Sequence, residues 1–384
     1  MNSRHYLDYN ASAPLRPVAR EAVLRALDGP GNASSIHAEG RAARALIEDA
    51  RRHVAELVGA DPRGIVFTAG ATEAANLSLT PDLAIPGRAR PMRCLALATE
   101  HACVLFGHRF DGLELIPVDG RGLADLAALE HMLQVAEKPC LVALQAANGE
   151  TGVVQPVAEA ARLVRAHGGV LVCDAVQAAG RIDIGPRTLG ADALVLSSHK
   201  IGGPKGAGAL VFADPDATID LPLLRGGGQE RRLRAGTEDV AAIAGFGAAA
   251  REVAAKGSEE ARHVAALRDG WERALSDVTP QAIVFGAGAP RLPNTSCFAV
   301  PGLKANTLLM ALDLAGVAVS AGSACSSGKI ARSHVLDAMG AAPHMGDGAI
   351  RASFGWGSDA ADMAALRDAL AMVIARRRPS GRAA

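Results

Sequence analysis

Hydrophobic positions between about residue 40 and residue 212 follow two alternating patterns. Residues 40–58 place Leu46, Ala50, Val54 and Leu57 on one face of a helix, and Gly59 is suited to end it. Short runs of continuous apolar residues follow, as expected for strands that are buried on both faces of a mainly parallel sheet. The predicted strands are 65–68, 94–98, 115–118, 141–144, 170–173, 193–197 and 209–212. Short strands separated by helices indicate an α/β doubly wound domain.

Beyond three glycines at 226–228 the pattern changes. Residues 239–268 predict long helices or one continuous connector. Strand-like segments near 283–285, 296–300 and 349–354 then predict a second, α+β unit. The chain ends in a predicted helix at about 359–378, with Ser358 as its N-cap.

Composition excludes several classes of function. The 384 residues carry 40 Lys+Arg against 40 Asp+Glu and only 3% aromatic residues, which argues against nucleic-acid binding. No segment is long and apolar enough to predict a membrane span, and the N-terminus lacks the apolar region of a secretory signal. The six cysteines have no metal-binding spacing, so we expect no metal site and a cytoplasmic, disulfide-free protein.

Lysine is scarce, with only six in the chain, and one of them lies at a predicted strand end. The strand 170–173 runs into Asp174, and the strand 193–197 runs into Lys200, 26 residues later. Ligands of open α/β sheets bind beyond the carboxyl ends of the strands, so both groups can face one crevice. A Schiff-base lysine with a carboxylate that keeps a pyridine nitrogen protonated is what pyridoxal phosphate requires.

This cofactor also needs a phosphate site. Residues 68–73, Thr-Ala-Gly-Ala-Thr-Glu, follow a predicted strand and open a helix, where free backbone N–H groups and the Thr72 hydroxyl are available. Ser197 and His199, beside Lys200, are further donors. The segment 202–206 (GGPKG) lacks the spacing of a nucleotide-binding loop and predicts a tight turn.

Eight motifs occur in a fixed order along nearly the whole chain. They are YLDYNASAP (6–14), FTAGATEAAN (67–76), ATEHACV (98–104), NGETGVVQPV (148–157), CDAVQAAG (173–180), LSSHKIGGPKGAGAL (196–210), GGGQERRLRAGT (226–237) and SAGSACSSG (320–328). The set resembles the cysteine desulfurases of the nitrogen-fixation and iron–sulfur-cluster type, which are class V aminotransferase family members with the fold-type I of pyridoxal phosphate enzymes. The resemblance implies a large cofactor-binding α/β domain at 12–255 and a small α+β domain formed by 1–11 and 256–384.

The resemblance also implies roles for individual residues around the cofactor. Lys200 matches the Schiff-base lysine, and Asp174 matches the partner of the pyridine nitrogen. Gln177 matches the residue that hydrogen-bonds the phenolic oxygen, and His101 the imidazole stacked on the ring, which can assist proton transfer. The matched phosphate ligands are Thr72, Ser197, His199 and, from a neighbouring subunit, Thr237. Thr237 therefore implies a homodimer with shared active sites.

Two further matches concern the substrate. Arg351 matches the arginine that binds the substrate carboxylate, a task suited to its two-pronged guanidinium. Where the family usually has Asn-Asn-Glu-x-Gly, this chain has Asn148-Gly149-Glu150-Thr151-Gly152, so the second asparagine is missing. Either Asn148 takes over its contact with the cofactor and substrate, or that contact is lost.

Cys325 lies in a segment of small and polar residues, 320–328, where a thiol is poorly buried and the chain is free to move. The other five cysteines mostly lie in apolar strands and predict structural roles. By the resemblance, Cys325 is the nucleophile that takes sulfur from L-cysteine as a persulfide, leaves L-alanine, and passes the sulfur to an acceptor protein of an iron–sulfur-cluster or thiolation pathway.

Two kinds of alternative function remain open at this point, and a third is disfavoured. A selenocysteine lyase, a sulfinate desulfinase or an aminotransferase has the same fold, although an aminotransferase has no use for a mobile thiol. The replacement at Gly149 also leaves room for a weakly catalytic sulfur-relay protein. A dinucleotide-binding oxidoreductase is disfavoured, because no G-x-G-x-x-G motif follows a predicted strand.

Overall fold

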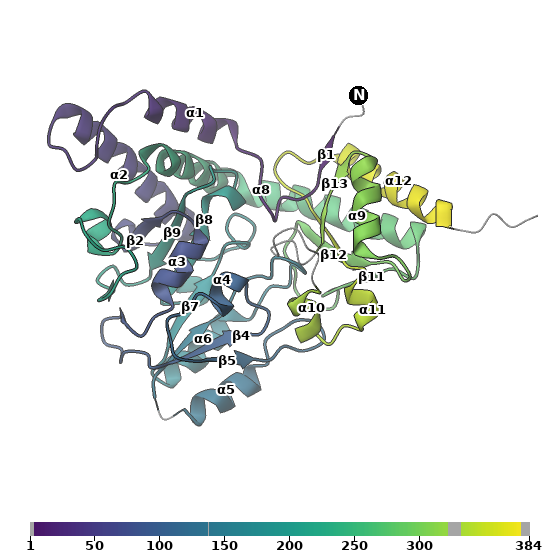
Figure 1. Cartoon of the computed structure of the whole chain (residues 1–384), viewed down its shortest axis with the longest axis horizontal. Coiled ribbons are helices and arrows are strands. Elements are labelled where there is room, and N and C mark those ends of the chain that lie inside the picture. The colour runs from purple at the N-terminus through teal and green to yellow at the C-terminus, as the bar shows by residue number, and fades with distance from the viewer. Residues whose placement is uncertain (1–3, 137, 322–331, 378–384) are drawn as a thin grey trace, which may run out of the picture.

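The computed structural model describes residues 4–136, 138–321 and 332–377, which form a large and a small lobe (Figure 1). One helix, α8 (Val240–Val278), runs through both lobes. Its 39 residues form a single element about 58 Å long, so the connector predicted for 239–268 is continuous and extends further. In the part of the chain that is described, no helix is both long and apolar enough to span a membrane.

A seven-stranded sheet forms the centre of the large lobe. All of its strands are parallel except β9, which runs antiparallel to both of its neighbours. In spatial order the strands are β2 (Ile65–Thr68), β9 (Gly208–Phe212), β8 (Ala193–Ser197), β7 (Val170–Asp174), β6 (Cys140–Ala143), β4 (Arg93–Leu97) and β5 (Leu113–Ile116). All seven predicted strands are present, shifted by at most two residues.

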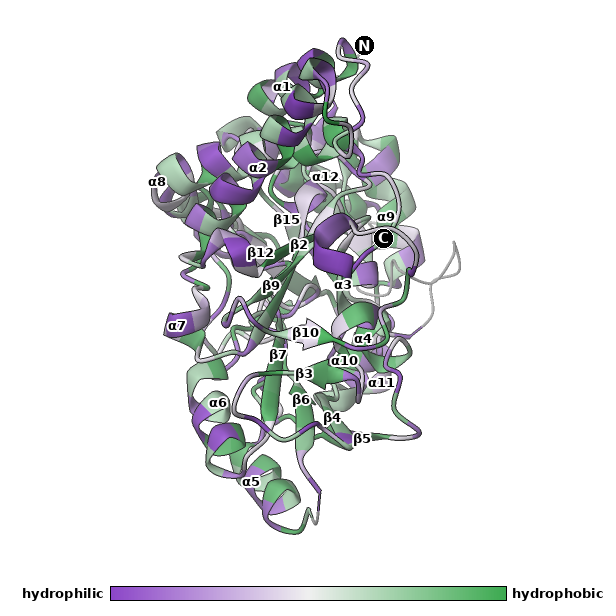
Figure 2. Ribbon diagram, turned by 90° about the vertical axis from the view of Figure 1, so that its left-hand side faces the viewer, coloured by the Kyte–Doolittle hydropathy of each residue, from purple (hydrophilic) through white to green (hydrophobic). Residues whose placement is uncertain are grey.

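The sheet is covered on both faces, as its apolar sequence predicts (Figure 2). Alternate residues of β4 belong to opposite cores: Leu95 and Leu97 to one, Cys94 and Ala96 to the other. The edge strand β5 is the exception to the predicted two-sided burial, because Leu115 is 52% exposed. The covering elements are α1 (Pro17–Leu27), α2 (Ala38–Val58), α5 (Leu126–Gln134), α6 (Val157–Ala166), α7 (Pro186–Leu189), α3 (Ala71–Ser78), α4 (Ala102–Leu105) and the ribbon of β3 (Leu83–Ala84) with β10 (Thr218–Ile219).

The small lobe contains a four-stranded antiparallel sheet with its own core. Trp271 of α8 is fully buried there and packs edge-on against Phe298, with ring centroids 5.2 Å apart. The strands are β11 (Ile283–Val284), β12 (Thr295–Ala299), β15 (Ile350–Ser353) and β14 (Ser320–Ala321), with helices α9 (Ala305–Leu314), α10 (His334–Ala338), α11 (Pro343–Gly346) and α12 (Ala360–Arg377). The N-terminal strand β1 (His5–Tyr6) joins this lobe by parallel pairing with β13 (Val317–Ala318).

The boundary between the lobes lies within α8. Val253 belongs to the core of the large lobe and Val264 to that of the small lobe. The division at residue 256 expected from the resemblance falls between them, and we propose it as the domain boundary.

The cap of the last helix differs from the prediction. Asp359, not Ser358, caps α12: its Oδ1 accepts hydrogen bonds from the backbone N–H groups of Ala361 and Asp362. The Ser358 hydroxyl instead accepts from the Gly355 N–H, 3.0 Å away, and closes the preceding turn. Both residues are good N-caps, so the sequence alone did not distinguish them.

Candidate active site

A cavity of about 580 Å³ opens at the carboxyl ends of the parallel strands. The strands β2, β4, β6, β7 and β8 contribute side chains to it from their last residues or from the segments that follow them. The cavity lining includes seven residues predicted from the sequence: Thr72, His101, Asp174, Gln177, Ser197, His199 and Lys200. The doubly wound topology thus brings together groups that are up to 128 residues apart in the chain.

Lys200 lies in a short 3₁₀ turn directly after β8. Its Nζ donates to the backbone carbonyls of Asn10, at 2.5 Å, and Ala11, at 3.0 Å. The N-terminal segment that supplies these carbonyls is itself tied to the turn, because the Ala13 N–H donates to the His199 carbonyl. The amine therefore faces the cavity with its position set by the chain's N-terminus.

Asp174, the last residue of β7, faces the same cavity. Burial raises the pKa of its carboxyl, and the Val176 N–H, 2.9 Å from Oδ1, opposes this together with His101 and Lys200. Glu100, fully buried behind it, has a strongly raised pKa because burial and the Asp174 charge both disfavour ionisation. A cationic ring nitrogen placed at Asp174 would stabilise the charged carboxylate.

His101 caps α4, and this fixes its tautomer. Its Nδ1 accepts a hydrogen bond from the Cys103 N–H at 3.2 Å, so the proton of the neutral ring lies on Nε2. The Cys103 Sγ is 3.1 Å from the same nitrogen. Cys103 lines the cavity and is only half-buried, which differs from the structural role predicted for it, although burial still raises the pKa of its thiol.

One end of the cavity has donors suited to a phosphate. The first turn of α3, the Thr72 and Ser197 hydroxyls and His199 all border it. Burial and the charge of Lys200 lower the pKa of His199 to about 4, so its imidazole is neutral near pH 7. Gly208 permits the close packing at this end, because a Cβ there would come within 2.6 Å of the Gly70 carbonyl carbon. This donor set fits a phosphorylated pyridine aldehyde bound to Lys200.

Three predicted residues, Asn148, Thr237 and Arg351, lie apart from the cavity lining. The Asn148 side chain closes its own turn, accepting from the N–H groups of Glu150 and Thr151 and donating to the Thr99 carbonyl at 3.1 Å. Thr237 borders a separate space of about 240 Å³. Cys325 lies outside the described residues.

Arg351, the third, is buried beside the cavity. Its Nη2 donates to Asp8 Oδ1 at 2.7 Å and its Nη1 to the Gly149 carbonyl at 3.0 Å. Its Nε is buried and has no hydrogen-bond partner among the described residues. The neighbouring Asn10 side chain also donates to the Gly149 carbonyl, at 3.1 Å. Asp8 and Asn10 belong to a quoted motif, but no property of the sequence indicated their contacts.

Glu150 occupies the position next to Gly149. Its carboxylate accepts a hydrogen bond from the Ser333 hydroxyl at 2.5 Å, which joins the large lobe to the start of α10. Burial raises the pKa of Glu150 to about 7, against the opposing effects of Ser333 and Arg351. Among the described residues, no group of three or more His, Cys, Asp or Glu side chains could hold a metal ion.

Several known proteins are similar to this chain in sequence or in fold. The class-V aminotransferase family model matches residues 5–366. A cysteine desulfurase from Cereibacter sphaeroides is 40% identical, with 97% of this chain and 96% of that protein aligned. An IscS-like cysteine desulfurase from Mycobacterium tuberculosis is 36% identical, with 99% of this chain and 98% of that protein aligned. The solved structure of a NifS-like protein from Rickettsia africae superposes with a TM-score of 0.88 at 32% identity, covering 97% of this chain and 99% of that one.

Proposed function

The chain belongs to the class-V aminotransferase family, and on that premise we propose that it is a pyridoxal 5′-phosphate-dependent cysteine desulfurase. It converts L-cysteine to L-alanine and retains the sulfur as a persulfide on Cys325. The single observation that carries the proposal is the convergence of Lys200, Asp174, Gln177 and a phosphate-binding turn on one cavity.

The cofactor supplies an electron sink for the substrate's Cα carbanion. Lys200 Nζ would hold it covalently, Asp174 would keep the pyridine nitrogen protonated, and Gln177 would donate to the phenolic oxygen. His101 would stack on the ring. Thr72, Ser197 and His199 would bind the phosphate as neutral donors, together with the N–H groups at the start of α3.

Arg351 binds the carboxylate of L-cysteine. A bidentate contact requires two adjacent N–H groups. The buried Nε, which has no hydrogen-bond partner among the described residues, supplies one of them. The other, Nη2, is bonded to Asp8, so the substrate displaces Asp8 from that nitrogen. Asn10 and Arg351 both hold the Gly149 carbonyl, which keeps this turn in place without an asparagine at position 149.

Lys200 is released when the amine of L-cysteine takes its place on the cofactor. Its free amine then acts as the base and accepts the substrate's Cα proton at Nζ, an atom that two backbone carbonyls orient in this structure. The His101 Nε2–H is the second group in position to exchange a proton with the substrate. The Cys325 thiolate attacks the substrate Sγ: an S–S bond forms, the Cβ–Sγ bond breaks, and the bonding pair stays with the carbon that becomes the methyl group of alanine. Overall, thiol and cysteine give persulfide and alanine, with no external oxidant or reductant.

We propose a homodimer in which Thr237 of one subunit contacts the phosphate of the other. Thr237 is exposed, and the space that it borders shares Ala69 and Gly206 with the lining of the main cavity. Phe106, which follows α4 and is 85% exposed, is an apolar side chain available for contact with a second subunit. An acceptor protein of an iron–sulfur or thiolation pathway takes the sulfur. A cytoplasmic location suits the five free cysteines of the described residues, because a reducing compartment preserves thiols.

Turnover with L-cysteine tests this function. The protein loaded with pyridoxal phosphate should release alanine and sulfide in equal amounts in the presence of a thiol reductant. Cys325→Ala should abolish sulfide release and Lys200→Ala should abolish both. Lys138→Ala should abolish neither, because Lys138 precedes β6 at the amino end of the strand, away from the cavity. Release of pyruvate, or unchanged sulfide from Cys325→Ala, would contradict the proposal.

A further inference from the structure

Arg181 carries a partly buried positive charge that the proposed reaction does not use. It follows β7 by seven residues and lies beneath Gln177. Burial and the nearby Arg351 lower its pKa to about 10, and no ion pair involves it among the described residues. Shielding a guanidinium from water without a carboxylate partner costs free energy, so its other contacts should account for its position.

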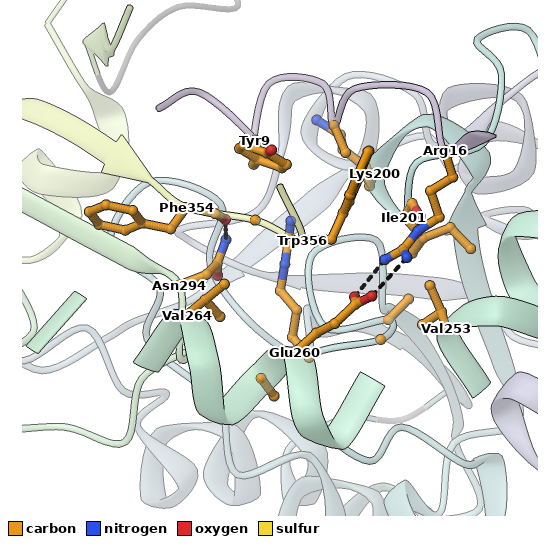
Figure 3. Close-up of a pocket in the computed structure, with 16 residues that line it drawn as sticks. Tyr9, Arg16, Lys200, Ile201, Val253, Glu260, Val264, Asn294, Phe354 and Trp356 are labelled. Atoms are coloured by element: carbon orange, nitrogen blue, oxygen red, sulfur yellow. Dashed lines mark hydrogen bonds and ion pairs between the residues drawn. The ribbon is translucent and has the colours of Figure 1, made fainter. Parts of the chain in front are cut away.

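A carboxylate that borders the same small cavity as Arg181 is already paired. Arg181 and Glu260 border the same small cavity of about 40 Å³, which lies behind Lys200 (Figure 3). Both oxygens of Glu260 are taken by Arg16, at 2.8 and 2.5 Å, and Figure 3 shows these two side chains facing each other. Arg181 therefore directs its charge elsewhere.

Its charge is directed at Gln177. The Arg181 Nη1 donates both to the Gln177 backbone carbonyl, at 2.6 Å, and to its side-chain Oε1, at 2.7 Å. On its other side, the Gln177 Nε2 donates to the Asn10 carbonyl at 2.9 Å. If the amide were turned over, its NH₂ group would face the guanidinium and its oxygen would face a carbonyl, so both contacts would become repulsive.

This orientation of the Gln177 amide determines which of its atoms faces the cavity. Nε2 carries two hydrogens, and the Asn10 carbonyl accepts only one of them, which leaves an N–H available on the cavity side. Gly149 leaves this side of the amide open: a Cβ at that position would lie 3.4 Å from Nε2. With no side chain at position 149 to hold the amide, its orientation depends on Arg181 and Asn10.

We propose that Arg181 is a positioning residue that fixes the Gln177 amide so that it presents N–H, and not oxygen, to the phenolic oxygen of the cofactor. This rests on the proposed function, because Gln177 contacts the phenolic oxygen only in a pyridoxal phosphate enzyme. Nothing in the proposed chemistry requires Arg181 to touch cofactor or substrate.

The test is a pH titration of the visible absorption band of the cofactor-loaded enzyme. In that state a proton is shared between the Lys200 nitrogen and the phenolic oxygen, and a second N–H donor to the oxygen stabilises the form that has lost the proton. Arg181→Met, which keeps the side-chain volume but donates nothing, should raise the apparent pKa of the band by about one pH unit. Arg181→Lys, which can still donate to Gln177, should leave the pKa close to its native value, and Arg162→Met, 75% exposed on α6, should not shift it.

A double-mutant cycle separates positioning from long-range charge. In a Gln177→Ala background, Arg181→Met should add no further shift, since the amide through which it acts is gone. The other titratable groups that line the cavity, Asp174, His101, Cys103, His199 and Lys205, are the same in all of these variants. Gln177→Glu keeps Arg181 paired but offers no N–H, and should also raise the pKa, which keeps the test decisive if Arg181→Met does not fold.

Each remaining outcome has one meaning. An unshifted band in loaded Arg181→Met, or an unshifted band in Gln177→Glu, overturns the positioning role. An equal shift in the Gln177→Ala background overturns it as well, in favour of a direct charge effect. Absence of any band when the native protein is mixed with pyridoxal phosphate would instead refute the proposed function itself.

Discussion

Replacing Glu230 by glutamine should destabilise the large lobe far more than one conservative change normally does. The Glu230 side chain is 1% exposed and accepts three hydrogen bonds: from Arg51 Nη1 at 2.9 Å, Arg51 Nη2 at 2.7 Å and the Phe67 N–H at 2.8 Å. Glu230 and the two residues after it all have positive φ, which costs energy in non-glycine residues, and the ion pair holds this segment in place. The same segment leads to Thr237.

The size of the loss in stability follows from the hydrogen bonds that the Arg51 guanidinium would lose. Glutamine has one acceptor oxygen, and its NH₂ group would face another N–H donor. Arg51, 9% exposed, would keep only the Ile65 carbonyl, at 2.8 Å, and the half-exposed Glu48, at 3.1 Å. Breaking a buried ion pair from one side costs about 3–5 kcal/mol, so the free energy of unfolding should fall by that amount.

Urea denaturation at one fixed protein concentration measures this change. The double variant Arg51→Met with Glu230→Leu should recover much of the loss, because apolar residues of similar volume can replace a buried pair. Glu114→Gln, at the exposed edge strand, is the control for removing a charge and should change stability by less than about 1 kcal/mol. A fall of less than about 1 kcal/mol for Glu230→Gln would refute the reasoning.

Three further changes test other parts of the site. Arg351→Lys, whose single nitrogen cannot give a two-pronged contact, should raise KM for L-cysteine about 10- to 100-fold and leave cofactor loading unchanged; steady-state kinetics checks this, and an unaltered KM would contradict the carboxylate role. The folded pKa of Glu150, about 7, lies above its unfolded value, so the stability it contributes is present in acid and is lost as the pH rises toward 7. Between about pH 5 and about pH 8, the free energy of unfolding should therefore fall by up to about 3 kcal/mol less in Glu150→Gln than in the native protein. Urea denaturation of both proteins at both pH values measures this, and an equal fall in the two proteins would disprove it. Gly208→Ala should weaken binding of pyridoxal phosphate by pushing Gly70 from the start of α3; equal affinity by fluorescence titration would show that this close packing is not needed.

The elements of the large lobe were predictable because their signal is local. Strands buried on both faces are continuously apolar, and the chain reaches the cavity at the residue where each run ends, so Asp174 and Lys200 were found as strand-end residues. Leu115 shows the limit of this rule: an apolar residue on an edge strand has the same sequence signature as a buried one. The roles of Gln177, His101 and Arg351 came from the resemblance, since nothing in their spacing indicates them.

Contacts between distant segments were not predictable. Asp8 and Arg351 are 343 residues apart, and Arg51 and Glu230 are 179 apart, so no periodicity connects them. Arg181 is only four residues from Gln177, but whether its guanidinium meets solvent or the Gln177 amide depends on how α8 packs against residues 179–181, which follow β7. Cys103 was interpreted as structural because its neighbours are apolar, whereas α4 begins at the cavity wall.

The central claim is that Lys200 is the lysine that binds the cofactor in this cavity. Reduction of the loaded protein with borohydride, followed by peptide mass spectrometry, would locate the cofactor on one lysine. Lys205 borders the same cavity and provides an internal alternative. The account predicts the adduct on Lys200, at about one per chain, and none in Lys200→Ala. An adduct on Lys205 in the native protein, or none on any lysine, would contradict it.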